Sequence, residues 1–379
     1  MDQHNPLKKR RNRMITWIIL SVIALIAIAV VTFFNLPKFG SVSKGERLER
    51  VKASSNYRNG SFQNLHETKQ VTSEGGILSA MGDFLFSKKE RLEPESALPV
   101  MKPDLSNLDR KEDLLVWFGH SSYLFQIDGY RILVDPVFFD ASPVSFYNKP
   151  FKGTNVFKPE DIPDIDFLVI SHDHWDHLDY QTVTALKERI GTVVCGLGVG
   201  QHFERWGFDK SAIVEMDWNE NHSFDNGLTI HCLPTRHFSG RSPKLNQSLW
   251  ASYLIDTKQH KIYIGGDGGY DSHYADIGNR FEDIDLAILE NGQYSENWKY
   301  IHLLPGNIVP AFNDLKAKRL FTVHHSKYAL ANHPWDEPIK NVVSFAKQNS
   351  INLLLPMIGE KVKLIDDQPY INKWWEGIE

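Results

Sequence analysis

Short apolar runs separated by polar turns dominate the chain from residue 112 onward. Their brevity and their content of Val, Ile, Leu and Phe predict buried strands. The Asp128-Gly129 pair between two of these runs predicts a hairpin turn. The expected strands span residues 114–118, 123–127, 131–134, 167–170, 192–195, 228–233, 249–255, 261–264, 286–289, 319–324 and 352–355.

Helical periodicity interrupts these strands at 180–190, 307–315 and 335–348. Pairs of strands alternating with helices are typical of an α/β sandwich, in which two sheets pack together and helices cover the outside. We therefore expect one α/β domain over residues 112–379.

The N-terminal region has a different pattern. Residues 14–36 carry no charge and follow a basic segment, residues 1–13. About 20 apolar residues span a bilayer, and Trp17 and Phe33-Phe34 stand near the two ends, where interface aromatics gather. A cleaved signal peptide is the alternative, with Ala27-Ile28-Ala29 as its cleavage site. We predict an uncleaved, single-pass membrane anchor that places the large domain outside the cytoplasm.

Residues 37–111 are polar and turn-rich, and we predict a linker and N-terminal extension. One stretch within them has apolar residues at helical spacing: Ile77, Leu78, Met81, Phe84 and Leu85. We expect this amphipathic helix to pack on the neighbouring domain. The alternative is that it lies on a membrane surface.

The composition of the chain argues against some classes of function and favours others. A net charge of −5 provides no basic footprint for nucleic acid, so no nucleic-acid partner is expected. Cys195 and Cys232 lie in apolar runs and are expected to be buried free thiols rather than a disulfide framework. The 16 histidines are clustered, with four between His172 and His202 and three between His324 and His333, which hints at metal chemistry.

The central motif is Ser171-His-Asp-His-Trp-Asp-His-Leu-Asp179, directly after an apolar strand. In an extended stretch residues i and i+2 point the same way, so His172 and His174 can bind one metal. Asp176 and His177 follow where the chain turns and can face a second. Imidazole and carboxylate ligands suit zinc, and also iron or manganese.

A His-x-His-x-Asp-His motif after an apolar strand resembles the metallo-β-lactamase superfamily. The resemblance implies an αββα sandwich with two metal ions, expected to be Zn²⁺. It also implies further ligands at later strand ends: His237, Asp267 as the bridging carboxylate, and His324 with His325 as the alternative. His172, His174 and His237 would hold one ion, and Asp176, His177 and His324 the other. Two residues of earlier segments, His120 and Asp135, would support the ligands; a satisfied core histidine is the alternative for His120.

Segments outside this motif resemble the phospholipases D that hydrolyse N-acylphosphatidylethanolamine: Val134-Asp-Pro-Val-Phe138, Glu215-Met-Asp-Trp218 and Tyr328-Ala-Leu-Ala-Asn332. This narrower resemblance implies a membrane phospholipid substrate and the products phosphatidic acid and an N-acylethanolamine. It implies catalytic roles for Asp176 and Asp267 and a substrate-side position for His302, with a surface or core histidine as the alternative. Gly268 departs from the mammalian pattern, which has a hydroxyl residue there.

Two other functions use the same residues. A metal-dependent lactonase or carboxylic-ester hydrolase would need the same metal centre, because fold alone does not fix the substrate. A non-catalytic, membrane-anchored metal-binding protein is the third alternative. The complete ligand set argues against it, since structural metal sites are usually closed.

Overall fold

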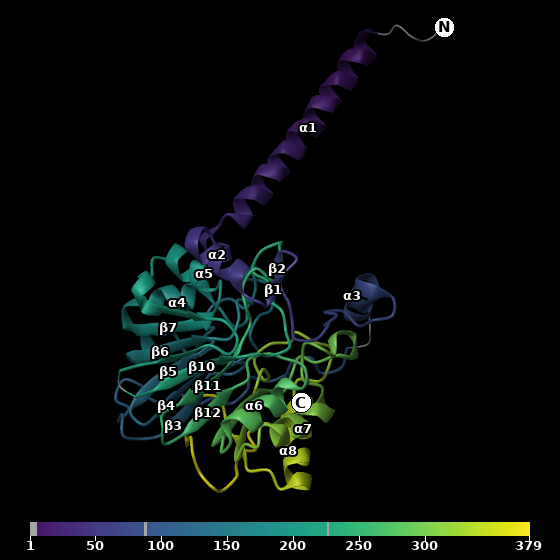
Figure 1. The fold of residues 1–379 in the computed structure, drawn as a ribbon. Coiled ribbons are helices and arrows are strands. Elements are labelled where there is room, and N and C mark those ends of the chain that lie inside the picture. The colour runs from purple at the N-terminus through teal and green to yellow at the C-terminus, as the bar shows by residue number, and fades with distance from the viewer. Residues whose placement is uncertain (1–5, 87–88, 226) are drawn as a thin grey trace.

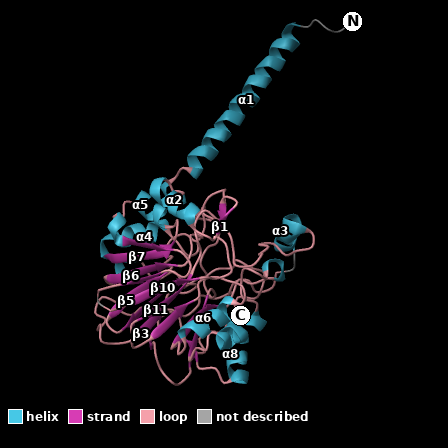
Figure 2. Cartoon of the chain, in the orientation of Figure 1, coloured by secondary structure: helices cyan, strands magenta, loops and turns pink. Residues whose placement is uncertain are grey.

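Two β-sheets packed face to face form the body of the protein, and one long helix projects away from it (Figures 1 and 2). The computed structural model describes residues 6–86, 89–225 and 227–379. One sheet has seven strands in the order β16-β3-β4-β5-β6-β7-β8. The other has eight, in the order β17-β15-β14-β13-β12-β11-β10-β9.

The strands of the first sheet are β3 (Leu114–Trp117), β4 (Tyr123–Ile127), β5 (Tyr130–Val134), β6 (Ile165–Ile170), β7 (Ile190–Gly196), β8 (Ile213–Met216) and β16 (Lys361–Lys363). Those of the second are β9 (Asn221–Ser223), β10 (Thr229–Leu233), β11 (Ser252–Asp256), β12 (Lys261–Ile264), β13 (Leu286–Glu290), β14 (Arg319–Val323), β15 (Leu353–Leu355) and β17 (Tyr370–Ile371). A separate small pair consists of β1 (Tyr57–Arg58) and β2 (Ser61–Phe62).

The helices are α1 (Pro6–Phe34), α2 (Gly45–Ala53), α3 (Gly76–Phe86), α4 (Tyr180–Leu186), α5 (Gly200–Arg205), α6 (His273–Phe281), α7 (Ile308–Asp314) and α8 (Glu337–Asn349). Helices α4 and α5 lie beside the first sheet, and α6, α7 and α8 lie beside the second (Figure 1). This is the predicted αββα sandwich, so the fold class is confirmed.

Strand direction explains where the functional residues gather. Strands β5, β6 and β7 are parallel to one another, and so are β12, β13, β14 and β15. Parallel strands have their carboxyl ends at the same edge of a sheet, so the loops that leave these strands emerge together. The predicted hairpin turn is also present, since Asp128 and Gly129 both have positive φ between β4 and β5.

Several elements were not predicted. Strands β8, β9, β16 and β17 and helices α2, α5 and α6 are each nine residues long or shorter. The helix predicted over 180–190 ends at Leu186, a 3₁₀ turn follows, and β7 begins at Ile190. The helix is shorter than predicted because Ile190 pairs with Ile165 of β6 and therefore belongs to the sheet.

Helix α1 begins at Pro6, inside the segment that we predicted as a separate basic region; residues 1–5 of that region lie outside the described part of the chain. Lys and Arg are good helix formers, which explains why the helix continues through them. Its apolar residues are exposed, and residues 7–34 are long and apolar enough to cross a membrane. The chain therefore has an exposed N-terminal helix of the kind found in membrane anchors and signal sequences.

The extension, residues 37–111, packs into the domain that follows it. Val51, Phe62, Leu98 and Leu105 are buried in the main core. These residues are isolated apolar positions in a polar stretch, so periodicity did not reveal their packing. Cys195 and Cys232 are both buried and unpaired, as predicted.

The predicted amphipathic helix is present as α3, but its predicted packing is wrong for two of its residues. Ile77 and Leu78 are 64% and 79% exposed. The side chains of Met81, Phe84 and Leu85 lie outside the described residues. Periodicity identifies an apolar face but not what covers it, and here part of that face is open to the surroundings.

One buried lysine makes the stability of the fold depend on pH. Lys327 donates to the carbonyl oxygens of Val137 (2.9 Å) and Phe118 (3.3 Å) and is only 1% exposed. Burial lowers the pKa of Lys327 to about 7, with Asp179 opposing the shift. The unfolded chain keeps this proton up to the ordinary pKa of 10.5, so between pH 7 and 9 it binds more protons than the folded chain, and raising the pH favours folding.

We expect the free energy of unfolding to rise from pH 7 to pH 9 by about 2 kcal/mol more in the wild type than in Lys327→Met. Urea titrations of both proteins in the same detergent, with metal kept saturating, measure this difference. Parallel pH profiles for the two proteins would show that Lys327 stays protonated in the folded state.

Candidate metal centre

The loop that follows β6 carries four of the predicted ligands and is fixed at both ends. At its start, Ser171 donates its backbone N–H and its hydroxyl to the carboxylate of Asp135, at 2.8 and 2.6 Å. At its end, Asp179 caps α4 by accepting the N–H of Gln181 at 3.1 Å. An apolar strand, an acidic anchor and a helix cap therefore hold the His-x-His-x-Asp-His segment in place.

Three histidines form the first ligand group: His172, His174 and His237. Their candidate ligand atoms lie within 4.8 Å of one another. His237 comes from the chain after β10, and its Nδ1 is 2.7 Å from the carbonyl oxygen of Ile301. That contact requires a proton on Nδ1 and leaves Nε2 as the metal-binding atom. Burial lowers the pKa of both His172 and His237, which keeps them in the neutral form that binds metal.

The second group contains Asp176, His177 and His324, and His120 lies with them. The ring Nε2 of His120 is 2.9 Å from Asp176 Oδ2. His324 follows β14, whereas His325 packs on Trp117 and contacts Ser326 and Thr322. Of the two alternatives, the structure places His324 at the cluster and turns His325 away.

Asp267 lies between the two groups. Its Oδ2 is 3.2 Å from His177 Nε2, 3.1 Å from His324 Nε2 and 3.8 Å from His237 Nε2. Gly266 before it has φ 60°, and a Cβ there would come within 2.9 Å of Ser171 Cβ, so this tight turn requires glycine. Burial pushes the pKa of Asp267 upward, but the charges of His177 and His324 outweigh burial and hold it well below its usual range.

The residues at this site fit a pair of metal ions. Within the described chain, Asp267 Oδ1 is buried and has no hydrogen-bond partner, and the buried Nε2 atoms of His177 and His324 lie near Asp267 Oδ2 without forming hydrogen bonds. Buried polar atoms are normally satisfied, and here three of them converge in one cluster. Imidazoles and carboxylates in this arrangement are a donor set for divalent ions such as zinc, iron or manganese.

The supporting residues lie directly behind the ligands. Asp135 Oδ2 is 2.8 Å from His177 Nδ1, which places the proton on Nδ1 and frees Nε2 for a metal. His302 lines the pocket above the cluster and stacks on His324, with ring centroids 5.2 Å apart. All the site residues predicted from the sequence thus lie in or beside one cluster.

Sequence reasoning missed Glu290. This carboxylate ends β13, is 1% exposed, and accepts the N–H groups of Gly268 (2.8 Å) and Leu303 (3.0 Å). Its other oxygen is 2.6 Å from His302 Nδ1. Glu290 therefore fixes both the loop that carries Asp267 and the orientation of His302. The signal was present as an acidic residue at the end of a wholly apolar strand.

A pocket of about 450 Å³ opens above the cluster. Its floor contains His174, Asp176, His237, Asp267, His302 and His324. Its walls are mainly apolar and come from the chain before α3, from α3 itself, and from the segments around residues 238, 298–301 and 330: Val71, Ile77, Ala80, Phe238, Trp298, Ile301 and Leu330. The site can therefore accept a molecule that is apolar over much of its length and polar where it meets the metals.

An αββα sandwich with this His/Asp cluster at the ends of its strands defines a metal-dependent hydrolase. The beta-lactamase superfamily domain matches residues 130–325, just over half of the chain, and the chain belongs to the metallo-β-lactamase superfamily.

Relatives of this chain differ in how similar they are and in how much of the chain they match. An uncharacterized protein of Mycobacterium tuberculosis is 36% identical over 85% of this chain and 87% of its own length. The N-acyl-phosphatidylethanolamine-hydrolyzing phospholipase D 1 of Caenorhabditis elegans is 31% identical over 62% of this chain and 70% of its own length. Among solved structures, an isothiocyanate hydrolase from Delia radicum gut bacteria matches with a TM-score of 0.51 at 17% identity, covering 67% of this chain and all of that one. This last likeness shows the fold alone.

Proposed function

We propose that this protein is a dinuclear-metal phosphodiesterase that hydrolyses N-acylphosphatidylethanolamine to phosphatidic acid and an N-acylethanolamine. The observation that carries the proposal is the apolar pocket above the metal cluster. Acyl chains need apolar walls, and the phosphodiester needs the cationic floor that bound metals provide. The similarity to the Caenorhabditis elegans enzyme, which is named for this activity, supports the choice of substrate.

Two ions, proposed to be Zn²⁺ with iron or manganese as alternatives, supply when bound an acidified water and positive charge beside the phosphoryl group. His172, His174 and His237 would hold one ion. Asp176, His177 and His324 would hold the other, and Asp267 would contact both. Asp176 is the candidate to steer the proton of the attacking water, because His120 holds this carboxylate at 2.9 Å. His302, oriented by Glu290, would contact the substrate from the pocket floor.

The membrane placement is part of the proposal. Helix α1 would remain attached as a single-pass anchor, with the hydrolase domain outside the cytoplasm. A membrane-held enzyme meets a bilayer lipid by diffusion in two dimensions. The apolar residues that α3 exposes, Ile77 and Leu78, favour the membrane-surface alternative for that helix.

The test is hydrolysis of vesicles containing N-acylphosphatidylethanolamine by protein extracted from membranes, with and without a chelator, beside a His174→Ala variant and a panel of lactones. Chelator-sensitive release of phosphatidic acid, absent in the variant, is the expected result. Turnover of a lactone without turnover of lipid would overturn the proposed lipid substrate but leave the proposed metal site in place. The intact mass of the same preparation should include residues 1–29, which cleavage of a signal peptide after Ala29 would remove.

We expect Leu78→Asp to lose about tenfold or more of its activity on vesicles, because a charge at this exposed position, outside the pocket lining, opposes contact with the apolar part of the membrane. Activity on a short-chain, water-soluble phosphodiester should stay within about twofold. Met101→Asp is the matched control, since Met101 is also exposed and does not line the pocket. Equal losses on both substrates would mean that α3 shapes the site rather than contacting a membrane.

A further inference from the structure

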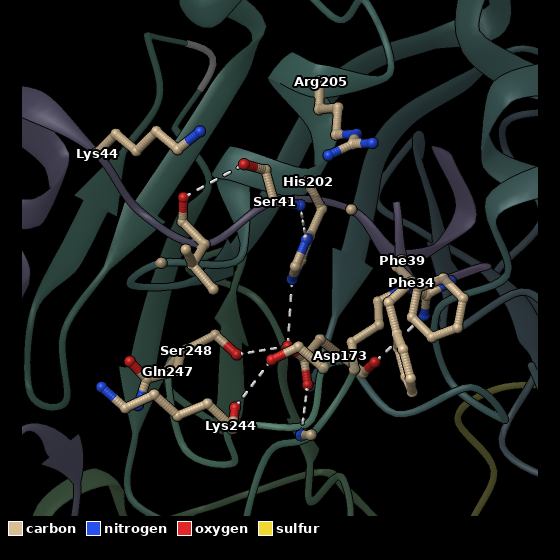
Figure 3. A pocket seen from close by; sticks show the side chains of 16 residues that line it. Phe34, Phe39, Ser41, Lys44, Asp173, His202, Arg205, Lys244, Gln247 and Ser248 are labelled. Atoms are coloured by element: carbon tan, nitrogen blue, oxygen red, sulfur yellow. Dashed lines mark hydrogen bonds and ion pairs between the residues drawn. The ribbon is translucent and has the colours of Figure 1, made fainter. Parts of the chain in front are cut away.

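A second pocket lies where α1 joins the domain (Figure 3). It has a volume of about 200 Å³. On one side are Phe34, the last residue of α1, and Phe39, whose ring centroids are 5.2 Å apart. Figure 3 shows Lys44 on the opposite side, with His202 and Asp173 between them. If α1 crosses a membrane, this pocket lies at the level of the lipid headgroups.

Positive charge surrounds the pocket. Lys44, Arg205 and Lys244 line it, and in the described chain none of them forms an ion pair with a carboxylate. The acidic groups near by are already engaged. Glu204 and Glu215 both pair with Arg47, at 2.6 and 2.5 Å.

Asp173, the one carboxylate in the lining, is also fully occupied. It accepts the hydroxyl of Ser248 (2.7 Å) and the N–H of Gly240 (2.9 Å), and it lies 3.2 Å from His202 Nε2. Among the described residues, the three exposed cations of the lining are thus left without a counterion.

A fourth cation is built into the wall. Arg241 is only 3% exposed and lines the pocket. It donates to the carbonyl oxygens of Lys38 (2.7 Å) and Asp173 (3.2 Å) and to that of Leu178 (2.5 Å). Its remaining nitrogen, Nη2, is buried and has no hydrogen-bond partner in the described chain. A buried guanidinium with an unused donor is costly unless an acceptor reaches it, and an anion forms the strongest such hydrogen bond.

From this geometry we infer that the pocket binds the phosphate of an anionic phospholipid of the membrane that holds α1. The phosphate oxygens would accept from Arg241 Nη2 and the exposed cations, and Phe34 and Phe39 would contact the glycerol and the start of the acyl chains. This inference rests on the proposal that α1 remains a membrane anchor. It concerns a non-substrate lipid at a site separate from the metal pocket.

The pocket is connected to the metal-binding loop. Ser41 donates its N–H to His202 Nδ1 at 3.0 Å, and His202 contacts Asp173, which stands between the ligands His172 and His174. Gly40 permits this approach, because a Cβ there would fall 1.9 Å from His202 Nδ1. A bound lipid would therefore support the same chain that positions the loop.

The experiment titrates the full-length protein in neutral detergent micelles with phosphatidylglycerol or phosphatidylcholine and counts bound lipids by native mass spectrometry. Three proteins are compared with the wild type. Lys44→Gln/Arg205→Gln/Lys244→Gln removes the exposed cations. Val42→Trp keeps every charge but narrows the pocket that Val42 lines. Lys316→Gln/Lys347→Gln/Lys363→Gln removes three lysines outside the pocket. Arg241 stays in place because it holds three carbonyl groups.

We expect the wild type and the three-lysine control to retain phosphatidylglycerol in preference to phosphatidylcholine. The pocket triple variant and Val42→Trp should each bind phosphatidylglycerol at least about tenfold more weakly. Unchanged binding in the triple variant would overturn the inference. So would a loss in the triple variant with full binding in Val42→Trp, since the cations would then act from an open surface.

A competition experiment with inorganic phosphate tests whether the pocket binds the lipid or a free anion. Displacement of phosphatidylglycerol by equimolar phosphate would assign the pocket to soluble phosphate and overturn the lipid assignment. Neither lipid is N-acylated, so this binding result is independent of whether the metal site hydrolyses N-acylphosphatidylethanolamine.

Discussion

Asp267→Ala is expected to abolish activity, with a loss of at least about 10³-fold, equivalent to about 4 kcal/mol of transition-state stabilisation. Asp267 is the only predicted carboxylate ligand that contacts histidines of both groups, at 3.2 Å from His177 and 3.8 Å from His237. Its removal therefore weakens both metal positions at once. It also leaves imidazoles crowded together without the negative charge that offsets them.

Metal content measured by elemental analysis should fall from about two ions per chain to one or fewer, in parallel with turnover of whichever ester the wild type hydrolyses. Asp271→Asn is the matched control. It lies four residues further along the same loop and pairs with His66 at 2.9 Å at the surface. A full metal complement in Asp267→Ala, with less than a tenfold loss of turnover, would show that this carboxylate is not a ligand.

The core of the site could be predicted because its residues follow simple local rules. The spacing of His172 and His174 on an extended stretch aims both side chains the same way. Asp267 and His324 follow apolar strands, and parallel strands bring such residues to one edge. The resemblance to the superfamily singled out Asp267 and His324 among the residues that follow strands, and strand direction explains why they meet His172 and His174.

Other residues could not be predicted because their roles depend on packing between distant segments. Glu290 is one acidic residue at a strand end, and its function comes from contacts with Gly268 and His302 on two other loops. Asp173 stands at an unspecified position of the motif, yet it ties the metal loop to Ser248 and His202. No spacing along the chain identifies such partners.

The contacts of the N-terminal region could not be predicted from the sequence either. The apolar run predicted a membrane-capable helix but not that its end would pack on the catalytic domain. Phe39 meets Trp175 of the metal-binding loop with ring centroids 5.1 Å apart, and the guanidinium of Arg241 lies 4.1 Å from the centre of the same Trp175 ring. The segment that follows α1 thus supports the loop that carries the ligands, which gives the extension a structural role beyond tethering.

Asp135→Asn is expected to weaken metal binding by about 10- to 100-fold without removing any ligand. The Asp135 carboxylate accepts from His177 Nδ1 (2.8 Å) and from the N–H and hydroxyl of Ser171 (2.8 and 2.6 Å). An amide keeps the size but offers an N–H₂ group where one acceptor stood. His177 then loses the partner that places its proton on Nδ1, and its Nε2 carries a proton in place of the lone pair that binds metal.

Titration with zinc under a competing chelator should show this loss, and activity should recover at high metal concentration because the ligand atoms are all present. Ser122→Ala is the control for a general effect on stability, since Ser122 donates to the backbone carbonyl of Asp135 (2.7 Å) and not to its carboxylate. That variant should unfold more easily yet bind metal normally. A loss of activity in Asp135→Asn that added metal does not restore would place Asp135 in the chemistry itself, whereas unchanged affinity would mean that His177 is oriented by the rest of the loop.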